Sequence, residues 1–436
     1  VATVAEPGLD AVDHLPRPGR GHQPDLLVAA CPCKTAVGMS PLKCMALAAL
    51  GAVMFVGSAQ AQTCDWPLWQ NYAKRFVQDD GRVLNSSMKP TESSSEGQSY
   101  AMFFALVGND RASFDKLWTW TKANMSGADI GQNLPGWLWG KKADNTWGVI
   151  DPNSASDADL WMAYALLEAA RVWNAPQYRA DAQLLLANVE RNLIVRVPGL
   201  GKMLLPGPVG YVHAGGLWRF NPSYQVLAQL RRFHKERPNA GWNEVADSNA
   251  KMLADTASNP HGLAANWVGY RATSANTGLF VVDPFSDDLG SYDAIRTYMW
   301  AGMTAKGDPL AAPMLKSLGG MTRATAASAT GYPPEKIHVL TGEVEKNNGY
   351  TPMGFSASTV AFFQARGETA LAQLQKAKVD DALAKALAPS APDTAQPIYY
   401  DYMLSLFSQG FADQKYRFEQ DGTVKLSWEA ACAVTR

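Results

Sequence analysis

Connections between predicted helices alternate between short and long, and this alternation limits the possible folds more than any other feature of the chain. Amphipathic patterns predict helices throughout, whereas the alternation typical of strands is sparse. The predicted helices cover residues 66–77, 96–108, 110–124, 157–173, 176–194, 221–236, 240–257, 292–305, 308–320, 356–366, 368–388 and 396–412. Only short turns follow helices 96–108, 157–173, 221–236, 292–305 and 356–366, whereas tens of residues precede those that begin at 157, 221, 292 and 356.

Short turns join helices into antiparallel hairpins. All helices entered from long connections should therefore begin at the same end of the molecule. Helix 396–412 would then pair with helix 66–77 and bring the two ends of the domain together. This pattern predicts an all-α fold of six helical hairpins closed in a ring, with the long loops forming a groove at one rim.

The first part of the sequence does not fit this helical domain. Residues 42–57 are apolar and too short to span a bilayer comfortably, and Ala59-Gln60-Ala61 has the small-x-small pattern of a cleavage site. We therefore expect residues 1–38 to be a non-native upstream extension, residues 39–61 a signal peptide and residues 62–436 a single domain. The mature protein should be periplasmic or secreted.

Cysteine usage agrees with export but does not fix a pairing. Cys31, Cys33 and Cys44 precede the expected cleavage site, which leaves Cys64 and Cys432 near the two ends of the mature chain. In an oxidising compartment they could form one disulfide, or they could be two separate thiols. Closure of the helical ring would bring them near each other.

Composition excludes several classes of partner. The net charge is −1 and no basic block is present, which argues against nucleic acid. No second stretch is apolar enough for a membrane span, so we expect no membrane insertion after signal cleavage, and we expect a monomer. The 14 Trp and 15 Tyr residues would suit the flat faces of sugar rings.

Three predicted helix starts combine a serine with an acidic residue. They place Glu96, Asp157 and Asp293 at what should be one rim. Each of these acids can also be explained by capping and by the helix dipole alone: Ser93 and Glu96 form a capping-box pattern, and Ser154 or Ser156 can cap the helix that carries Asp157. Asp159 cannot form a dyad with Asp157, because positions two apart on a helix differ by about 200° in direction. We therefore assign Asp159 a structural role.

Aromatic and basic residues in the long loops favour a sugar polymer as the ligand of these carboxylates. The six His show no metal-binding spacing, and no complete nucleotide-binding or nucleophile motif is present, so we expect no metal and no cofactor. The residues that flank the helix starts are Trp137, Trp139, Trp147, Trp218, Arg219, Tyr224, Tyr292 and Arg296.

These motifs resemble glycoside hydrolase family 8, and in particular its periplasmic endoglucanases of bacterial cellulose-synthesis operons. The resemblance covers about Cys64 to Cys432. The segments that carry it are Ala155–Trp173, Ser94–Tyr100, Trp137–Lys142, Trp218–Tyr224, Ser291–Arg296, Gly331–Lys336 and Tyr399–Tyr402.

The resemblance implies an (α/α)6 barrel and the inverting endo-hydrolysis of β-1,4-glucan such as cellulose, with the cellulose synthase or export complex as a further partner. It makes Glu96 the general acid and Asp293 the general base, while Asp157 binds and distorts the sugar. The substrate-binding positions that it suggests are Trp137, Trp139, Trp218, Arg219, Tyr224, Tyr292, Arg296, Tyr399 and Tyr402.

Inversion requires the two carboxyl groups to lie about 6.5–9.5 Å apart, so that a water molecule fits between base and sugar. A helix N-terminus favours the charged form of Glu96, so burial and a neighbouring carboxylate would have to raise its pKa. Two alternatives stay open from the sequence. One is a catalytically silent glucan-binding or export-guiding protein, and the other is a hydrolase or lyase that acts on a different polysaccharide.

Overall fold

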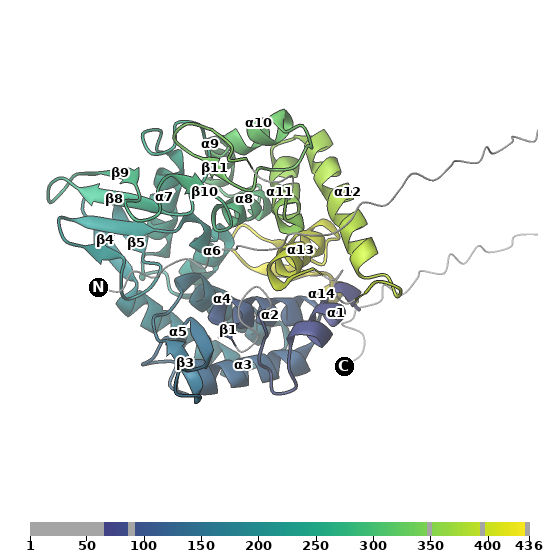
Figure 1. Ribbon diagram of the computed structural model, residues 1–436. Helices are drawn as coiled ribbons and strands as arrows, with labels where there is room; N and C mark the ends of the chain where they lie inside the picture. Colours follow the sequence, from purple (N-terminus) through teal and green to yellow (C-terminus); the bar gives the residue numbers. More distant parts are fainter. Residues whose placement is uncertain (1–64, 86–91, 347–350, 393–396, 432–436) are drawn as a thin grey trace, which may run out of the picture. The chain divides into compact units, whose positions relative to one another are not determined.

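The computed structural model describes residues 65–85, 92–346, 351–392 and 397–431, which all belong to the compact unit Gln60–Arg436 (Figure 1). The expected upstream extension, the signal peptide and the cysteines Cys64 and Cys432 lie outside the described residues. Within the described ranges, none of the helices combines the length and apolar character needed to span a bilayer.

Each helix predicted from the sequence is present. The observed bounds are α1 Pro67–Phe76, α2 Ser95–Val107, α3 Arg111–Met125, α4 Ser156–Val172, α5 Pro176–Asn192, α6 Leu227–Glu236, α7 Trp242–Ala254, α8 Ala294–Met303, α9 Ala311–Ser317, α11 Met353–Ala365, α12 Thr369–Ala386 and α13 Tyr399–Ala412. The sequence patterns missed two short helices, α10 Gly320–Ala327 and α14 Ser427–Ala431.

The predicted helix 221–236 is interrupted. Asn221 caps only the short 3-10 helix η1 (Pro222–Tyr224), where its Oδ1 atom accepts a hydrogen bond from the Ser223 N–H at 3.0 Å. Val226 then has extended backbone angles, and α6 begins at Leu227. The Asn-Pro pair therefore marks a separate turn and not the start of α6.

Six helices form an inner ring. Helix α2 contacts α4, α4 contacts α6 and η1, η1 contacts α8, α8 contacts α11, α11 contacts α13, and α13 contacts α2 (Figure 1). Helices α3, α5, α7, α9 and α12 each pack against the inner helix that precedes them, and α1 packs against α13. This arrangement is the predicted (α/α)6 barrel, with helices 396–412 and 66–77 paired as expected.

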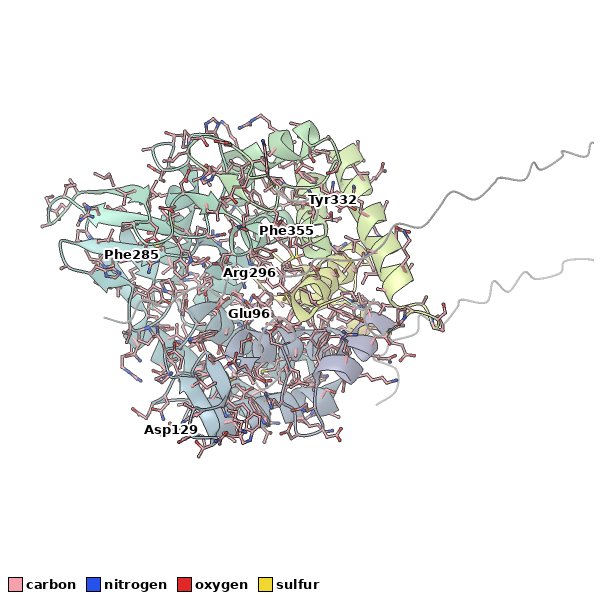
Figure 2. All side chains as sticks on the ribbon, viewed as in Figure 1. Glu96, Asp129, Phe285, Arg296, Tyr332 and Phe355 are labelled. Carbon is pink, nitrogen blue, oxygen red and sulfur yellow. The ribbon has the colours of Figure 1, made fainter. Side chains whose placement is uncertain are left out.

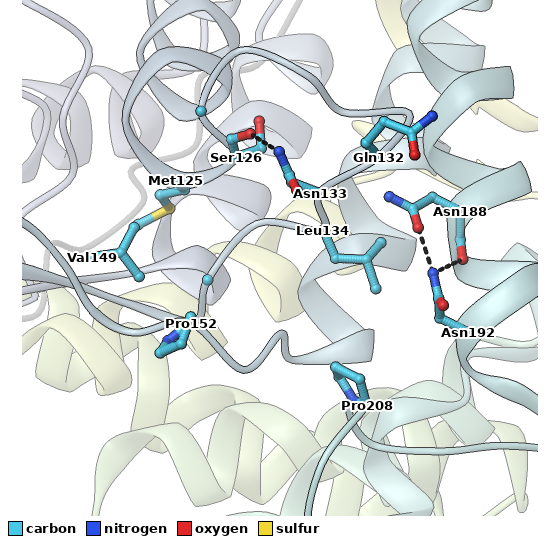
Figure 3. Close-up of a pocket in the computed structure, with 12 residues that line it drawn as sticks. Met125, Ser126, Gln132, Asn133, Leu134, Val149, Pro152, Asn188, Asn192 and Pro208 are labelled. Carbon is cyan, nitrogen blue, oxygen red and sulfur yellow. Dashed lines mark hydrogen bonds between the residues drawn. The ribbon is translucent and has the colours of Figure 1, made fainter.

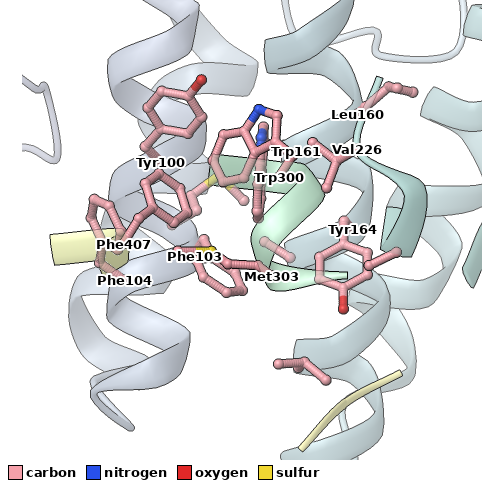
Figure 4. Close-up of a cluster of buried hydrophobic side chains, with 14 of the residues drawn as sticks. Tyr100, Phe103, Phe104, Leu160, Trp161, Tyr164, Val226, Trp300, Met303 and Phe407 are labelled. Carbon is pink, nitrogen blue, oxygen red and sulfur yellow. The ribbon is translucent and has the colours of Figure 1, made fainter. Parts of the chain in front are cut away.

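Aromatic side chains from several helices of the ring pack together in its centre (Figure 4). Phe103 of α2 stacks on Phe407 of α13, with ring centroids 5.6 Å apart. Trp161 of α4 lies 4.8 Å from Phe103 and 5.3 Å from Trp300 of α8. Such aromatic pairs contribute about 0.5–1.5 kcal/mol beyond the area that they bury. The inner helices α2, α4, α8, α11 and α13 are buried on nearly all faces, as helices without a polar side must be, whereas α6 has a polar side with the exposed Lys235.

The long connections contain short antiparallel strands that the sequence patterns did not reveal. One sheet has three strands, β1 Ser93–Ser94, β2 Leu138–Lys141 and β3 Trp147–Asp151. Another has four strands, β6 Val212–His213, β7 Leu217–Phe220, β8 Val268–Ala272 and β9 Gly278–Val282. Three further pairs are β4 Ile194–Val197 with β5 Gly201–Leu204, β10 Leu289–Gly290 with β11 Ile337–His338, and β12 Tyr416–Phe418 with β13 Val424–Leu426. Strands of two to five residues are too short to establish an alternation in the sequence. In addition, β7 pairs with β8 across the whole α6–α7 hairpin.

A close approach between the inner helices α8 and α11 depends on a glycine. A Cβ atom added at Gly302 of α8 would lie only 2.2 Å from the backbone nitrogen of Phe362 in α11. Gly302→Ala should therefore lower the free energy of unfolding by about 1–3 kcal/mol, although alanine is the better helix former. Urea unfolding of the purified protein measures this change.

Gly148→Ala is a matched control, because its added Cβ would meet only the flexible end of the Lys142 side chain, at 3.1 Å. We expect this variant to be about as stable as the wild type. A Gly302→Ala protein with wild-type stability would show that α8 and α11 can move apart without cost.

Candidate active site

Arg296 of α8 holds the three predicted carboxylates together. Its Nη1 atom donates to Glu96 Oε2, and its Nη2 atom lies 2.8 Å from Asp293 Oδ1. The same Nη1 atom lies 3.5 Å from Asp157 Oδ2 and 3.2 Å from the Tyr100 hydroxyl. Figure 2 shows Arg296 and Glu96 near the centre of the helical ring. The expected convergence of three acids is confirmed.

The barrel places these acids at the starts of three inner helices. Glu96 and Asp157 are the second residues of α2 and α4, and Asp293 immediately precedes α8. The cap of α2 is Ser94, whose Oγ atom accepts a hydrogen bond from the Gly97 N–H at 3.1 Å, and not Ser93 as the capping-box pattern suggested.

The capping predicted for Ser154 or Ser156 is wrong, because Ala155 occupies the cap position of α4 and no side chain bonds there. Asp157 itself accepts a hydrogen bond from the Ala158 N–H at 2.8 Å. Asp157 therefore bonds to the backbone at its own helix start as well as facing Arg296.

Burial gives the carboxyl groups different protonation properties. Desolvation raises the pKa of Glu96 above its usual range; Arg296 opposes this shift and the charge of Asp293 adds to it. Desolvation likewise raises the pKa of Asp157 to about 7, again against the effect of Arg296 and with a contribution from Glu96. The side chain of Asp293 is 32% exposed, against 22% for Glu96 and 5% for Asp157. The site thus combines a buried acid whose pKa is raised with a carboxyl group that water can reach.

Asn266 positions the helix start that carries Asp293, and the sequence patterns did not identify it. Its Oδ1 atom accepts hydrogen bonds from the Ser291 N–H at 2.8 Å and the Ala294 N–H at 3.0 Å. Asp293 lies between these two residues and makes no capping bond of its own. The residue that caps α8 comes from the segment before β8, far away in the sequence, so no local motif could reveal it.

Aromatic residues surround this ion-pair network. The Arg296 guanidinium carbon lies 5.9 Å from the ring centroid of Tyr224. Tyr400 lies close enough for the charges of Arg296 and Glu96 to affect its pKa, which burial raises, and its hydroxyl donates to the Tyr292 carbonyl. Tyr292 donates from its own hydroxyl to Glu335 Oε1 at 2.6 Å. The predicted residues Tyr224, Tyr292 and Arg296 are therefore brought together.

Tyr399 and Tyr402 have no exposed surface at this site. Both are completely buried and pack against Tyr72 and Phe76 of α1. The predicted contact of Tyr399 and Tyr402 with substrate does not fit this position. Tyr400, between them in sequence, is partly exposed beside the ion-pair network, and the charges of Glu96 and Arg296 also affect the pKa of the buried Tyr399.

The predicted tryptophans of the first long loop form a separate group. Trp139 is mostly buried and stacks on the half-exposed Trp147 with a centroid distance of 5.3 Å. The Arg82 guanidinium carbon lies 4.8 Å from Trp139 and 5.1 Å from Trp147. Trp137 is partly buried, and its backbone carbonyl accepts from the Ser95 N–H that begins α2. Trp137 and Trp139 therefore lie beside β1, the strand that leads to Glu96.

Trp218 and Arg219 lie on β7, at the sheet of strands β6 to β9. Trp218 is partly buried and packs against the apolar cluster beneath this sheet. The Arg219 guanidinium makes two hydrogen bonds to the fully buried Asp283, of 2.7 Å and 2.8 Å. The charge of Arg219 is therefore neutralised within the protein.

Asp159 points away from the ion-pair network, as the helical geometry predicts. It is completely buried, and the pKa of its carboxyl group is raised well above the usual range by desolvation. Among the described residues, Arg296 forms ion pairs with Glu96, Asp157 and Asp293 and none with Asp159.

A cavity of about 410 Å³ lies apart from the carboxylates (Figure 3). Neither Arg296 nor any of the three acids lines it. Its walls combine amide and apolar side chains, including Asn133, Leu134, Asn188, Asn192 and Pro208. Among the described residues, no group of three or more His, Cys, Asp and Glu side chains could hold a metal ion. The predictions of no metal and no cofactor stay predictions.

Comparisons with known proteins agree with this geometry. The model of a family described as glycosyl hydrolases family 8 matches residues 42–414. An endoglucanase from Xanthomonas axonopodis pv. citri (strain 306) is 40% identical over 379 residues, which are 87% of this chain and 94% of that protein. An endoglucanase from Escherichia coli (strain K12) is 40% identical over 376 residues, which are 86% of this chain and 95% of that protein. The crystal structure of endo-1,4-D-glucanase from Vibrio fischeri ES114 has a TM-score of 0.74 and 35% identity, covering 84% of this chain and 99% of that one.

The raised pKa of Asp157 predicts a pH dependence of stability. The pKa is about 7 in the folded protein against a usual value of 3.8, so between these pH values the folded chain binds more protons than the unfolded chain. The free energy of unfolding should therefore fall as the pH rises through this window. Asp157→Asn should reduce the decrease by on the order of a few kcal/mol, because the amide never has to carry a buried charge.

Urea unfolding at pH 5 and pH 8 measures the effect in both proteins. Asp144→Asn serves as a control, since Asp144 is exposed and remote from Arg296. An equal loss of stability in the wild type and in Asp157→Asn would contradict the burial of a protonated Asp157.

Proposed function

Since the chain belongs to family 8 of the glycosyl hydrolases, we propose that it hydrolyses β-1,4-glucan at internal bonds and inverts the configuration at the anomeric carbon. In this proposal Glu96 is the general acid and Asp293 is the general base. Asp157 binds the sugar ring beside the bond that is cut. The substrate is a neutral glucan chain such as cellulose.

The observation that carries this assignment is the shared contact of Arg296 with all three acids. Inverting hydrolysis needs one protonated carboxyl group and one carboxylate on opposite sides of the anomeric carbon. The buried environment that raises the pKa of Glu96 supports its role as the proton donor. The greater exposure of Asp293 supports its role beside the attacking water.

The proton transfers balance within one step. Glu96 transfers its proton to the glycosidic oxygen while the bond from that oxygen to the anomeric carbon breaks. Water attacks the anomeric carbon from the opposite face and transfers a proton to Asp293. The step leaves Glu96 as a carboxylate and Asp293 as a neutral acid, and the two groups regain their starting states by exchange with solvent.

Arg296 stabilises the carboxylate that forms on Glu96 in this transfer. Its guanidinium already donates to Glu96, so it stabilises the negative charge that develops there as the proton leaves. It also donates to Asp293, which orients that carboxylate toward the position of the water. Arg296 is therefore an electrostatic group of the reaction, in addition to its role in assembling the site.

The location and partners of the enzyme form a separate part of the proposal. The apolar stretch 42–57 and the cleavage pattern that ends at Ala61 support action in the periplasm or after secretion. Participation in cellulose synthesis, a contact with the synthase or export complex, and a monomeric state are predictions that rest on the sequence.

The configuration of the first product tests the reaction directly. Digestion of cellohexaose followed by proton NMR should show the α-anomer of the new reducing end first, because one displacement inverts the β-linkage. The viscosity of a soluble cellulose derivative should also fall well before many reducing ends appear. Glu96→Gln and Asp293→Asn should each lower kcat by at least about 100-fold, since each removes a proton-transfer group.

The controls separate the alternatives that the sequence left open. Asp159→Asn should retain activity if the protein folds, because Asp159 lies outside the ion-pair network. Initial release of the β-anomer, or substantial turnover by Glu96→Gln, would refute the inverting assignment. Glucan binding without any cleavage by the wild type would instead support a silent binding protein, and an unsaturated product would identify a lyase.

Asn266 should act as a positioning residue for Asp293. Asn266→Ala removes the acceptor that holds the Ser291 and Ala294 N–H groups, so kcat should fall by about 10- to 100-fold while KM changes little. Asn266→Asp keeps an acceptor oxygen and should recover much of kcat. Asn192→Ala, at the end of α5, provides the matched control and should behave as the wild type. An Asp variant as slow as the Ala variant would argue against positioning by this acceptor.

A further inference from the structure

The segment Gly331–Lys336, between α10 and α11, reaches the start of α8, although no step of the proposed reaction uses it. Its residue Glu335 makes two hydrogen bonds there. The Glu335 carboxylate accepts from the Tyr292 hydroxyl at 2.6 Å, and the Glu335 backbone carbonyl accepts from the Ser291 hydroxyl at 2.8 Å. Ser291 and Tyr292 immediately precede Asp293 in the sequence. Glu335 therefore binds the segment that carries the proposed general base.

The position of Glu335 is fixed by the strand pair that follows it. Strand β11 pairs with β10, and Gly290 lies opposite the buried Ile337 (Figure 1). A Cβ atom added at Gly290 would lie only 2.4 Å from the Ala264 carbonyl oxygen, so β10 also packs tightly against the segment before β8. Glu335 is itself partly buried and comes shortly before Ile337. Backbone pairing and packing therefore hold its acceptor groups at the start of α8.

Tyr292 is held by contacts on several sides. The Tyr400 hydroxyl donates to the Tyr292 carbonyl, and the ring of Tyr292 packs against Phe355 of α11 with a centroid distance of 5.1 Å. The side chain is nevertheless 37% exposed, so its position depends on these contacts and not on complete burial. The hydrogen bond to Glu335 fixes the hydroxyl end of the ring.

Glu335 and Asn266 bind different groups of the same short segment. Asn266 accepts from the backbone N–H groups of Ser291 and Ala294, whereas Glu335 accepts from the hydroxyls of Ser291 and Tyr292. The Asp293 side chain is 32% exposed, so burial alone does not hold it in place. Its alignment therefore depends on the backbone from which it projects and on its ion pair with Arg296.

We propose that Glu335 is a positioning residue for the general base Asp293. This inference rests on the proposed function and deepens it, because it assigns to the α10–α11 connection the alignment of the base. Glu335 holds Ser291 and Tyr292, and these residues fix the backbone that aims the Asp293 carboxylate at the attacking water. A misplacement of about 1 Å can lower the rate of a reaction about 100-fold. Glu335 exchanges no proton in this role.

Two substitutions of Glu335 test the proposal. Glu335→Ala should lower kcat on cellohexaose about 5- to 30-fold and change KM little, since alignment of the base matters in the transition state. Glu335→Gln keeps an oxygen that accepts from the Tyr292 hydroxyl, so it should recover most of kcat. Glu343→Ala is the matched control, because Glu343 is an exposed carboxylate of the same connection, and it should match the wild type. Urea unfolding verifies that each variant is folded in the assay.

An activated leaving group shows which side of the reaction is affected. The substrate 2,4-dinitrophenyl β-cellotrioside releases a phenolate that needs no proton from Glu96, but it still needs a water molecule activated by Asp293. Glu335→Ala should therefore lose kcat on this substrate by the same factor as on cellohexaose. A loss confined to cellohexaose would place the effect at the general acid and would overturn the proposal.

Three further kinetic results would contradict positioning by this acceptor. Wild-type kcat in Glu335→Ala would show that the base is aligned without it. A Gln variant as slow as the Ala variant would show that the acceptor oxygen is not the group that matters. A higher KM with unchanged kcat would identify Glu335 as a sugar-binding group instead.

Amide hydrogen exchange keeps the test independent of the catalytic assignment. If the wild type cleaves neither substrate, the proposed function fails, but exchange in the peptide of residues 289–296 still shows whether Glu335 fixes this segment. Glu335→Ala should speed exchange at the Ser291 and Ala294 amides at least about 5-fold, because their local opening becomes easier. Glu335→Gln and Glu343→Ala should match the wild type. Equal exchange in all of these proteins would refute the inference.

Discussion

The ion-pair network of Arg296 is the interaction on which the functional part of this structure depends. Three carboxylates brought into a buried space would repel one another, and their charged forms would lose the solvation of water. One guanidinium that contacts Glu96, Asp157 and Asp293 offsets both effects. It does so without forcing all three acids to ionise, because burial still raises the pKa values of Glu96 and Asp157.

The barrel supplies the rigidity that this network requires. Aromatic contacts such as those of Trp161 with Phe103 and Trp300 fix the inner helices against one another below the site. The close approach of α8 to α11 at Gly302 fixes the helix that carries Arg296. Asn266 then sets the start of α8 from outside the helix. Helix packing thus determines the direction of the charged groups, and local hydrogen bonds complete their alignment.

The long connections serve the rim in two ways. Their short strands pair across distant parts of the chain, as β7 does with β8, and thereby hold the loops in place. Residues that flank these strands carry ring contacts from Tyr224 to Trp267. Under the proposed function, the helix starts perform the chemistry and the paired strands hold the loops around them.

The sequence by itself determined the helical hairpins, their closure into a ring and the three helix starts that carry the acids, because helical periodicity and connection length are local properties. It also separated Asp157 from Asp159 through the angular spacing of a helix. Only the tertiary structure revealed that Arg296 contacts all three acids and that Asn266 caps α8. It also revealed that Tyr399 and Tyr402 are buried. These features, like the short paired strands, depend on contacts between residues far apart in the chain. The raised pKa of Glu96 depends in the same way on the exclusion of water when the chain folds.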